Sequence, residues 1–232
     1  MTENAKLVLL RHGKTQFNKD KIFCGWTDIE LGGEGEKEAR EAGKKLLENG
    51  YSFDLAYTSY LRRAIKTTWA VLEEMNLMWL PVFKHWRLNE RHYGALQGIR
   101  HEEMAAKAGQ EQVQKWRRSF DVRPPALEKN DPRYPGNEAK YFALKKSELP
   151  ACESLEDTIK RVLPYWKKEI APTIRKGRRV LISAHGNSLR ALVKHLDGIP
   201  DDEIPKLEIP TGRPLVYELG PKLRPVKHYY LE

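Results

Sequence analysis

Two short apolar runs, far apart in the chain, each end on a histidine followed by a glycine. LVLLRHG spans residues 7–13, and VLISAHG spans residues 180–186. Each run is too short for a helix and rich in branched side chains, which is typical of a strand buried on both faces. The second run leads straight into the helical pattern SLRALVKHL. In an open α/β sheet, ligands bind beyond the carboxyl ends of the strands, so both histidines are candidate site residues.

Extended and helical patterns alternate along the rest of the chain. Further strands are expected in FDLAYTS, WLPVF, PLVYEL and VKHYYL, with WLPVF at a sheet edge because Pro81 cannot donate a hydrogen bond. Helical spacing of apolar residues occurs over 34–48, 61–75 and 155–166, and Pro164 is expected to kink the last of these helices. This alternation predicts an α/β fold of three layers, α/β/α, with a mostly parallel central sheet.

The length of 232 residues suits one α/β domain with a substantial core. We therefore expect a single catalytic domain over residues 1–232. The segment from about 84 to 149 is rich in charge, proline and aromatic residues, and it carries helical patterns near 102–107 and 111–120. We interpret this segment as an insertion laid over the sheet that covers the site.

Composition excludes several classes of protein. No apolar run approaches the roughly 20 residues of a membrane span. The N-terminus lacks the pattern of a secretory signal, and two distant cysteines favour a reducing compartment, so a cytoplasmic location is expected. The formal charge is +9, but most charges are interleaved in sign and no nucleic-acid motif accompanies them. The excess charge therefore favours a small anionic ligand rather than nucleic acid.

The predicted sheet edge collects groups that suit phosphate. Arg11 precedes His12, and Arg63 follows the strand in FDLAYTS by a few residues. Guanidinium groups bind phosphate and carboxylate through paired donors, and the helix that begins near Gly186 adds backbone N–H groups. Nearby positive charge disfavours the imidazolium form, so a histidine there keeps a lone pair. A neutral imidazole beside a bound phosphoryl group is a nucleophile.

Phosphoryl transfer also needs an acid and a base for the substrate oxygen. Glu90, in RLNERHYGALQG, is the best candidate because it lies in a glycine-containing loop among basic and aromatic residues. A surface ion pair of Glu90 with Arg87 or Arg91 remains an equally good interpretation. Gly13 is expected to let the chain bend after His12 and to let a phosphate approach the main chain.

Several motifs together resemble one family. They are RHGKTQFN, FCGWTDIELG, SYLRRAIKT, LNERHYGALQG, WRR, DPRYPG, ESL and AHGNSLRALVKHL, in this order from about Lys6 to Leu231. They resemble the 2,3-bisphosphoglycerate-dependent phosphoglycerate mutases of the histidine phosphatase superfamily. The resemblance implies a phosphoglycerate mutase-like fold and the interconversion of 3-phosphoglycerate and 2-phosphoglycerate in glycolysis and gluconeogenesis. It further implies a phosphohistidine intermediate primed by 2,3-bisphosphoglycerate, no metal, no membrane partner, and a homodimer or homotetramer.

The same resemblance implies roles for individual residues. His12 matches the histidine that is phosphorylated, His185 the second histidine at the phosphoryl group, Arg11 and Arg63 the phosphate-binding arginines, and Glu90 the acid/base. The residues that match the substrate-binding positions are Thr15, Asn18, Cys24, Gly25, Arg91, Tyr93, His101, Arg117, Arg118, Gly186 and Asn187.

The chain departs from the family pattern at four places. Lys14 stands where the family usually has glutamate, Cys24 where it has threonine, and His101 where it has lysine. The printed sequence ends at YYLE, whereas many members continue with a partly basic tail over the site mouth. Because a phosphohistidine survives only where water is kept out, we expect a raised hydrolytic side reaction.

The sequence is also compatible with three other functions. A phosphatase on the same scaffold would use the same histidines and release phosphate to water. A bisphosphoglycerate synthase would differ only in which orientation of the substrate receives the phosphoryl group. A non-catalytic basic binding protein is supported by charge alone. For Trp69, Trp79 and Trp86, burial in the core is expected over a role in a subunit interface.

Overall fold

A six-stranded sheet forms the centre of the protein, seen here in a computed structural model that describes residues 5–232. The strands are β1 (Ala5–Arg11), β2 (Leu55–Thr58), β3 (Val82–Lys84), β4 (Val180–Ala184), β5 (Leu215–Leu219) and β6 (Pro225–Tyr230). Their order is β3-β2-β4-β1-β5-β6, and only β5 runs against the others. The mostly parallel sheet is confirmed, as is the place of β3 at an edge.

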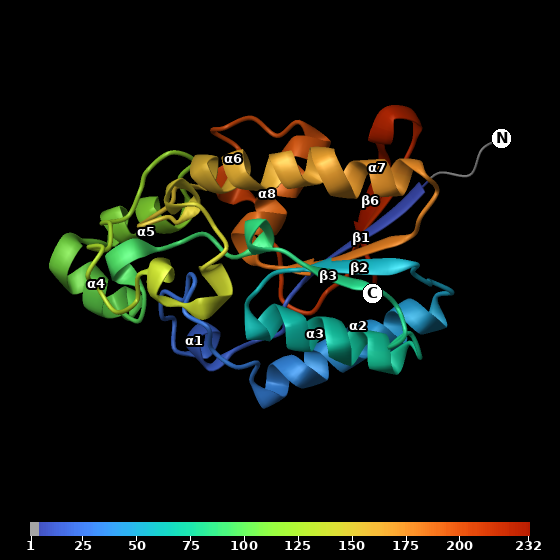
Figure 1. Ribbon diagram of the computed structural model, residues 1–232, viewed down its shortest axis with the longest axis horizontal. Coiled ribbons are helices and arrows are strands. Elements are labelled where there is room, and N and C mark those ends of the chain that lie inside the picture. The colour runs from blue at the N-terminus through green and yellow to red at the C-terminus, as the bar shows by residue number, and fades with distance from the viewer. Residues whose placement is uncertain (1–4) are drawn as a thin grey trace.

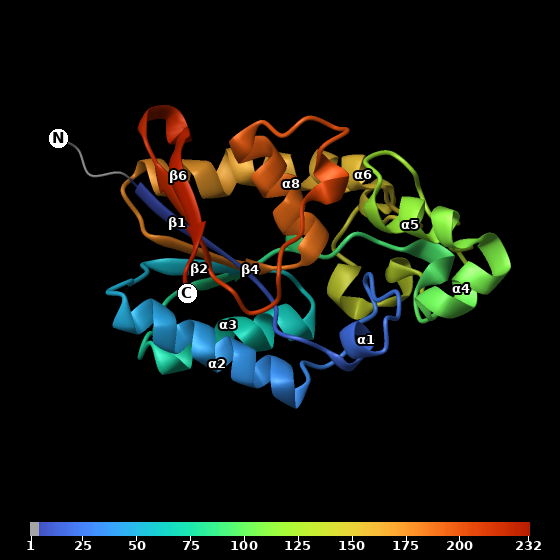
Figure 2. The ribbon, with the colours of Figure 1, turned by 180° about the vertical axis from the view of Figure 1, so that it is seen from behind.

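Helices cover both faces of this sheet, so the three-layer arrangement is confirmed (Figures 1 and 2). Helices α2 (Gly33–Glu48) and α3 (Arg62–Glu74) lie on one face, and α6 (Leu155–Tyr165), α7 (Ala171–Arg175) and α8 (Gly186–Asp197) lie on the other. Successive side chains of β1 point to opposite faces of the sheet, and all of the buried ones are apolar, so both faces carry a core. Leu7 and Leu9 join the core under α6 and α8, whereas Val8 and Leu10 join the core under α2 and α3.

The long helical run on the second face is not regular throughout. Between α6 and α7 the chain makes a π-helical turn over Trp166–Ile170, in which the N–H of Ala171 bonds to the carbonyl of Trp166. Pro164 and Pro172 flank this turn, and neither can donate a backbone hydrogen bond. The kink expected at Pro164 thus takes the form of a widened turn, and the run continues into α7 (Figure 1).

The segment 84–149 lies beyond the carboxyl end of the sheet, together with the short helix α1 (Gln16–Lys19) (Figure 1). It contains α4 (His101–Ala108) and α5 (Gln110–Arg118). Short 3-10 turns occur at Trp86–Leu88, Gly94–Leu96, Pro135–Asn137, Ala139–Tyr141 and Lys146–Glu148, and later at Ile204–Lys206 and Pro221–Leu223. Two small apolar clusters, around Phe23 and around Trp26, pack this segment against the N-terminal part of the chain.

The tryptophans divide between core and surface. Trp86 is buried in the cluster around Trp26, as predicted. The prediction of burial was wrong for Trp69 and Trp79, which are 47% and 74% exposed. Among residues 5–232, none of the helices combines the length and the apolar character of a membrane span.

Candidate active site

The two histidines of the His-Gly motifs meet at the carboxyl end of the sheet. Arg11, the last residue of β1, is in register with Ala184, the last residue of β4, because these strands are parallel neighbours. The N–H of His12 donates to the carbonyl of Ala184 at 3.0 Å, and the imidazole rings of His12 and His185 lie 5.0 Å apart. Residues 173 positions apart therefore share one site.

The imidazole of His12 has its reactive nitrogen defined by its neighbours. Nδ1 lies 2.8 Å from the carbonyl oxygen of Gly13, which can only accept, so Nδ1 carries the proton. Nε2 receives the Nε–H of Arg63 at 3.3 Å and thus holds a lone pair. Burial, with the positive charges of Arg63 and Arg11, lowers the pKa of His12 well below its usual range. His12 is a neutral imidazole with a nucleophilic Nε2.

Arg63, in the first turn of α3, is held almost entirely by the protein. It is 1% exposed, and its Nη1 and Nη2 donate to the carbonyls of Thr27 and Gly25 at 2.9 and 2.8 Å. Only Nε faces His12. The guanidinium of Arg63 is therefore held in a fixed position beside Nε2 of His12.

His185 is fully buried and is fixed from one side. Its Nε2 lies 2.7 Å from the hydroxyl of Ser59, which also accepts the N–H of Leu61. Burial and the charge of Arg63 lower the pKa of His185, so its ring is neutral. Its Nδ1 is buried and has no partner among residues 5–232. No site role was predicted for Ser59, although its position directly after β2, beside β4, is the signal that could have found it.

Glu90 is not a surface ion pair. It is 8% exposed, and its Oε1 accepts the backbone N–H groups of Arg91 and Asn187 at 2.8 and 2.9 Å. The interpretation as a partner of Arg87 was wrong, because Arg87 pairs with Glu148. Oε2 of Glu90 and the guanidinium of Arg11 both lie beside Gly186. One carboxylate oxygen is thus anchored by backbone N–H groups, while the other lies near the guanidinium of Arg11.

Arg11, Glu90 and Gly186 line a cavity of about 820 Å³. Eleven of the predicted site residues line it: Arg11, Asn18, Cys24, Gly25, Glu90, Tyr93, His101, Arg117, Arg118, Gly186 and Asn187. The other five lie behind this lining and are at most 3% exposed: His12, Thr15, Arg63, Arg91 and His185.

Two of those five make contacts that are structural in kind. The Oγ1 of Thr15 caps α1 by accepting the N–H of Asn18. Arg91 is fully buried and donates to the carbonyl of Arg117 at 2.6 Å and to the hydroxyl of Tyr93 at 2.9 Å. Both therefore shape the lining instead of forming it.

The cavity is strongly cationic. Arg11, Lys21, Arg117 and Arg190 line it, and within residues 5–232 no carboxylate lies in ion-pairing distance of any of them. Buried Nε–H groups of Arg11 and Arg190 are also without partners in that range. Sequence reasoning missed Lys21 and Arg190. Arg190 could have been found, because it lies one helical turn after Asn187 and hydrogen bonds to its amide.

Three of the four departures from the family pattern are single residues, and the surroundings of each determine its charge. Lys14 binds Glu34 and Glu38 at 2.7 and 3.3 Å, so its positive charge is compensated locally. Burial raises the pKa of the Cys24 thiol, which keeps it protonated. Burial, with Arg117 and Lys21 nearby, lowers the pKa of His101 to about 4, so His101 is neutral near pH 7.

A metal ion needs a different set of side chains from an anion, namely several His, Cys, Asp or Glu close together. Across residues 5–232, no three His, Cys, Asp or Glu side chains are grouped so that they could hold a metal ion. The groups that meet around His12 are imidazoles, guanidiniums and the carboxylate of Glu90, and the cavity lining adds lysines as well as Glu34 and Glu208. Cations in excess over carboxylates suit a phosphate ester.

Solved structures with a similar fold cover nearly the whole chain. A mycobacterial glucosyl-3-phosphoglycerate phosphatase, solved with VO3, is 24% identical with a TM-score of 0.73, over 97% of both chains. The alpha-ribazole phosphatase from Shigella flexneri is 23% identical with a TM-score of 0.68, over 98% of this chain and 96% of its own. YhfR from Bacillus stearothermophilus is 23% identical with a TM-score of 0.68, over 93% and 92%. At these identities the likeness shows the fold alone.

The family follows from the sequence match. A model of the histidine phosphatase superfamily, branch 1, matches residues 7–133 and 128–229, which together take in both His-Gly motifs and the loop of Glu90. Since this match covers nearly the whole chain, the chain belongs to the histidine phosphatase superfamily.

Proposed function

We propose that this enzyme interconverts 3-phosphoglycerate and 2-phosphoglycerate through a phosphohistidine on His12, primed by 2,3-bisphosphoglycerate. The observation that carries the proposal is the set of cavity cations without carboxylate partners, supplied by four different parts of the chain. A monophosphate needs one such point, whereas a bisphosphoglycerate presents two phosphates and a carboxylate. Arg11 near His12, with Lys21, Arg117 and Arg190 farther along the chain, can neutralise several anionic groups at once.

The first half-reaction phosphorylates the enzyme. Nε2 of His12 attacks phosphorus, the bond to the ester oxygen breaks, and that oxygen takes a proton from Oε2 of Glu90. As the phosphoryl group reaches His12, the Nε–H of Arg63 changes its acceptor from Nε2 to a phosphoryl oxygen. Arg11 stabilises the charge that spreads over the equatorial oxygens.

His185 contributes a second donor. We assign the hydroxyl of Ser59 as the donor to Nε2 at 2.7 Å, which puts the single proton of the neutral ring on Nδ1. This buried N–H, which has no partner among the described residues, is then available to a phosphoryl oxygen.

The second half-reaction returns the phosphoryl group. A hydroxyl of the bound phosphoglycerate attacks phosphorus, gives its proton to Glu90 and releases His12. The mutase differs from a phosphatase only in this attacking oxygen, because water in the same place gives hydrolysis. Cations that hold the intermediate in the cavity favour the mutase reaction.

Phosphatase activity is the second candidate. Two of the solved structures with this fold are named as phosphatases, one of them for glucosyl-3-phosphoglycerate. The neutral, buried His12 would serve hydrolysis equally well. A bisphosphoglycerate synthase remains a variant of the same chemistry.

One assay separates these functions. The protein is given 3-phosphoglycerate with a trace of 2,3-bisphosphoglycerate, and 2-phosphoglycerate and free phosphate are followed together. We expect isomer formation to exceed phosphate release, and Arg117→Gln to raise the KM for 3-phosphoglycerate. Intact-mass measurement should find one added phosphoryl group that His12→Ala removes. Phosphate release without isomer would favour the phosphatase, and no adduct on the unaltered protein would refute the mechanism.

We also propose a homodimer or homotetramer in the cytoplasm. The exposed indoles of Trp69 and Trp79 support self-association, and the unpaired cysteines Cys24 and Cys152 fit a reducing compartment. Sedimentation velocity would test the first point, because a species at the 27.0 kDa of a single chain would contradict it.

A further inference from the structure

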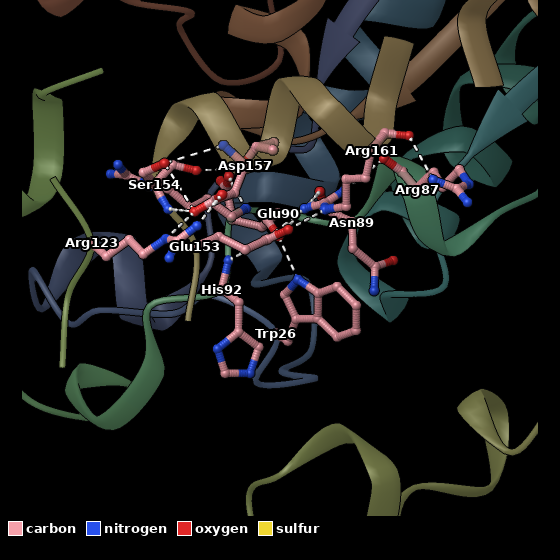
Figure 3. A network of polar contacts seen from close by, with 12 residues as sticks. Trp26, Arg87, Asn89, Glu90, His92, Arg123, Glu153, Ser154, Asp157 and Arg161 are labelled. Carbon is pink, nitrogen blue, oxygen red and sulfur yellow. Dashed lines mark hydrogen bonds and ion pairs between the residues drawn. The ribbon is translucent and has the colours of Figure 1, made fainter. Parts of the chain in front are cut away.

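A buried ion pair lies outside the cavity and close to Glu90. Nε of Arg161 donates to Oε1 of Glu153 at 2.5 Å, and the two side chains are 7% and 4% exposed (Figure 3). Neither residue lines the cavity described above. Arg161 comes from α6, and Glu153 lies just before it.

Arg161 uses its remaining donors on the main chain around Glu90. Nη1 donates to the carbonyl of Arg87 at 2.6 Å, and Nη2 donates to the carbonyls of Asn89 and Glu90 at 3.0 and 2.8 Å (Figure 3). The indole N–H of Trp26 donates to the same Glu90 carbonyl at 2.6 Å. The rigid fork of one guanidinium therefore fixes the peptide groups on both sides of the Glu90 Cα.

Glu153 holds the same loop two residues later. Its Oε2 accepts the N–H of His92 at 2.8 Å, and its own N–H donates to the carbonyl of His92 at 2.8 Å. The same Oε2 also accepts Nη2 of Arg161 at 3.0 Å. The carboxylate thus ties the guanidinium and the loop into one unit.

The buried pair of Arg161 and Glu153 is better explained by the orientation of the Glu90 loop than by a gain in the free energy of unfolding. Removing two charges from water costs about as much as their attraction returns, so a buried ion pair is a weak reason for stability. The pair instead holds the backbone of the loop in one orientation, because charge-assisted hydrogen bonds from a guanidinium tolerate little displacement of their acceptors. All the contacts converge on residues 87–92, and Glu90 is the member of that segment whose carboxylate lines the cavity.

We infer that Glu153 and Arg161 are positioning residues that aim the carboxylate of Glu90 at the substrate oxygen. The inference rests on the proposed function, in which Glu90 is the acid/base. A displaced Glu90 would still leave His12, Arg11 and Arg63 in place. The loss should therefore appear where the leaving oxygen needs a proton, and not where it leaves as a stable anion.

The experiment compares two phosphoryl donors in single-turnover phosphorylation of His12. With 2,3-bisphosphoglycerate the leaving oxygen is an alkoxide that needs the proton of Glu90, whereas p-nitrophenyl phosphate releases a stable phenolate. We expect Glu153→Gln and Arg161→Lys to slow phosphorylation by 2,3-bisphosphoglycerate about tenfold or more, as a displaced catalytic group does. Phosphorylation by p-nitrophenyl phosphate should stay within about twofold, because general acid help contributes little to a good leaving group.

The matched control is Arg123→Gln. Arg123 forms a two-bonded pair with Asp157 of α6, at 2.6 and 2.7 Å. Its side chain is 62% exposed, and among residues 5–232 it makes no hydrogen bond or ion pair with residues 87–92. This variant should phosphorylate at the unaltered rate with both donors. Rates are expressed per phosphorylatable His12, so that a fraction of misfolded protein does not enter them.

Each outcome decides one point. An equal fall with both donors, or no fall with either, overturns the positioning role. If Arg161→Lys does not fold, Glu153→Gln decides alone, since the amide keeps one acceptor for Arg161. Glu90→Gln separates the inference from the function: it should show the same donor selectivity, more strongly. If Glu90→Gln shows none, the proposed acid/base fails; if it does and Glu153→Gln does not, only the positioning role fails.

Discussion

One carboxylate of the cavity lining already pairs with a cation of the same lining. Glu208 lines the cavity and forms an ion pair with Arg118, although the Glu208 side chain is 71% exposed. This carboxylate accepts from a guanidinium that, in the proposed function, an anionic substrate would use. An incoming phosphate or carboxylate therefore has to replace Glu208 on Arg118 before that cation contributes to binding.

Removing this competitor should tighten substrate binding. We expect Glu208→Gln to lower the KM for 3-phosphoglycerate about two- to fivefold with kcat nearly unchanged, the scale of an exposed pair worth about 0.2–1 kcal/mol. The control is Glu203→Gln, whose carboxylate pairs with Lys206 and does not line the cavity. Steady-state kinetics would check this, and a KM that stays the same or rises in Glu208→Gln would contradict it.

At the scale of elements, the loop after β1 is held by direct contact with the start of α2. A Cβ on Gly13 would lie 2.0 Å from the carbonyl oxygen of Gly35, and a Cβ on Gly35 would lie 2.1 Å from that of Lys14. Gly13 does not have a positive φ, so its absent side chain serves this close approach and not an unusual backbone conformation. The hydroxyl of Thr67, in α3, also accepts the N–H of Gly13.

Gly35→Ala should therefore displace the loop that carries His12. We expect a loss of about 1–3 kcal/mol in the free energy of unfolding, as for other overpacked sites. We also expect slower phosphorylation of His12. Gly33→Ala is the matched control, because it is also in the first turn of α2 and a Cβ there meets nothing within 4 Å. Chemical denaturation would measure both variants, and equal stability of Gly35→Ala and the unaltered protein would argue against this contact.

The contact between Gly13 and Gly35 is one that the sequence alone could not predict. Periodicity predicted the strands and helices, and the shared edge of a parallel sheet predicted that His12 and His185 meet. Periodicity describes the faces of one element and not what packs on them, so it missed the exposure of Trp79 and the close packing of Gly13 on Gly35. Contacts between distant segments, such as Ser59 with His185 or Arg161 with the Glu90 loop, depend on the assembled fold and have no local pattern.

Across the whole molecule, burial keeps most of the histidines neutral. Burial lowers the pKa of His92 to about 3 and those of His85 and His101 to about 4, and it lowers the pKa values of His12 and His185 well below their usual range. In the unfolded chain each returns to about 6.5. Between that value and the lower folded value, only the unfolded chain binds the proton.

This difference makes the fold sensitive to mild acid. Above about pH 6.5 both states are neutral at these histidines, and stability is complete; as pH falls, unfolding takes up protons and stability declines. The fully buried His92, His12 and His185 should each contribute about 1.4 kcal/mol per pH unit in this window. We expect the midpoint of thermal unfolding, followed by circular dichroism, to fall steeply from pH 7 to pH 5, before the carboxylates titrate. Because buried groups are little screened, the fall should persist in about 1 M salt. A midpoint that is constant over this range, or a fall that salt abolishes, would place the acid sensitivity in surface ion pairs instead.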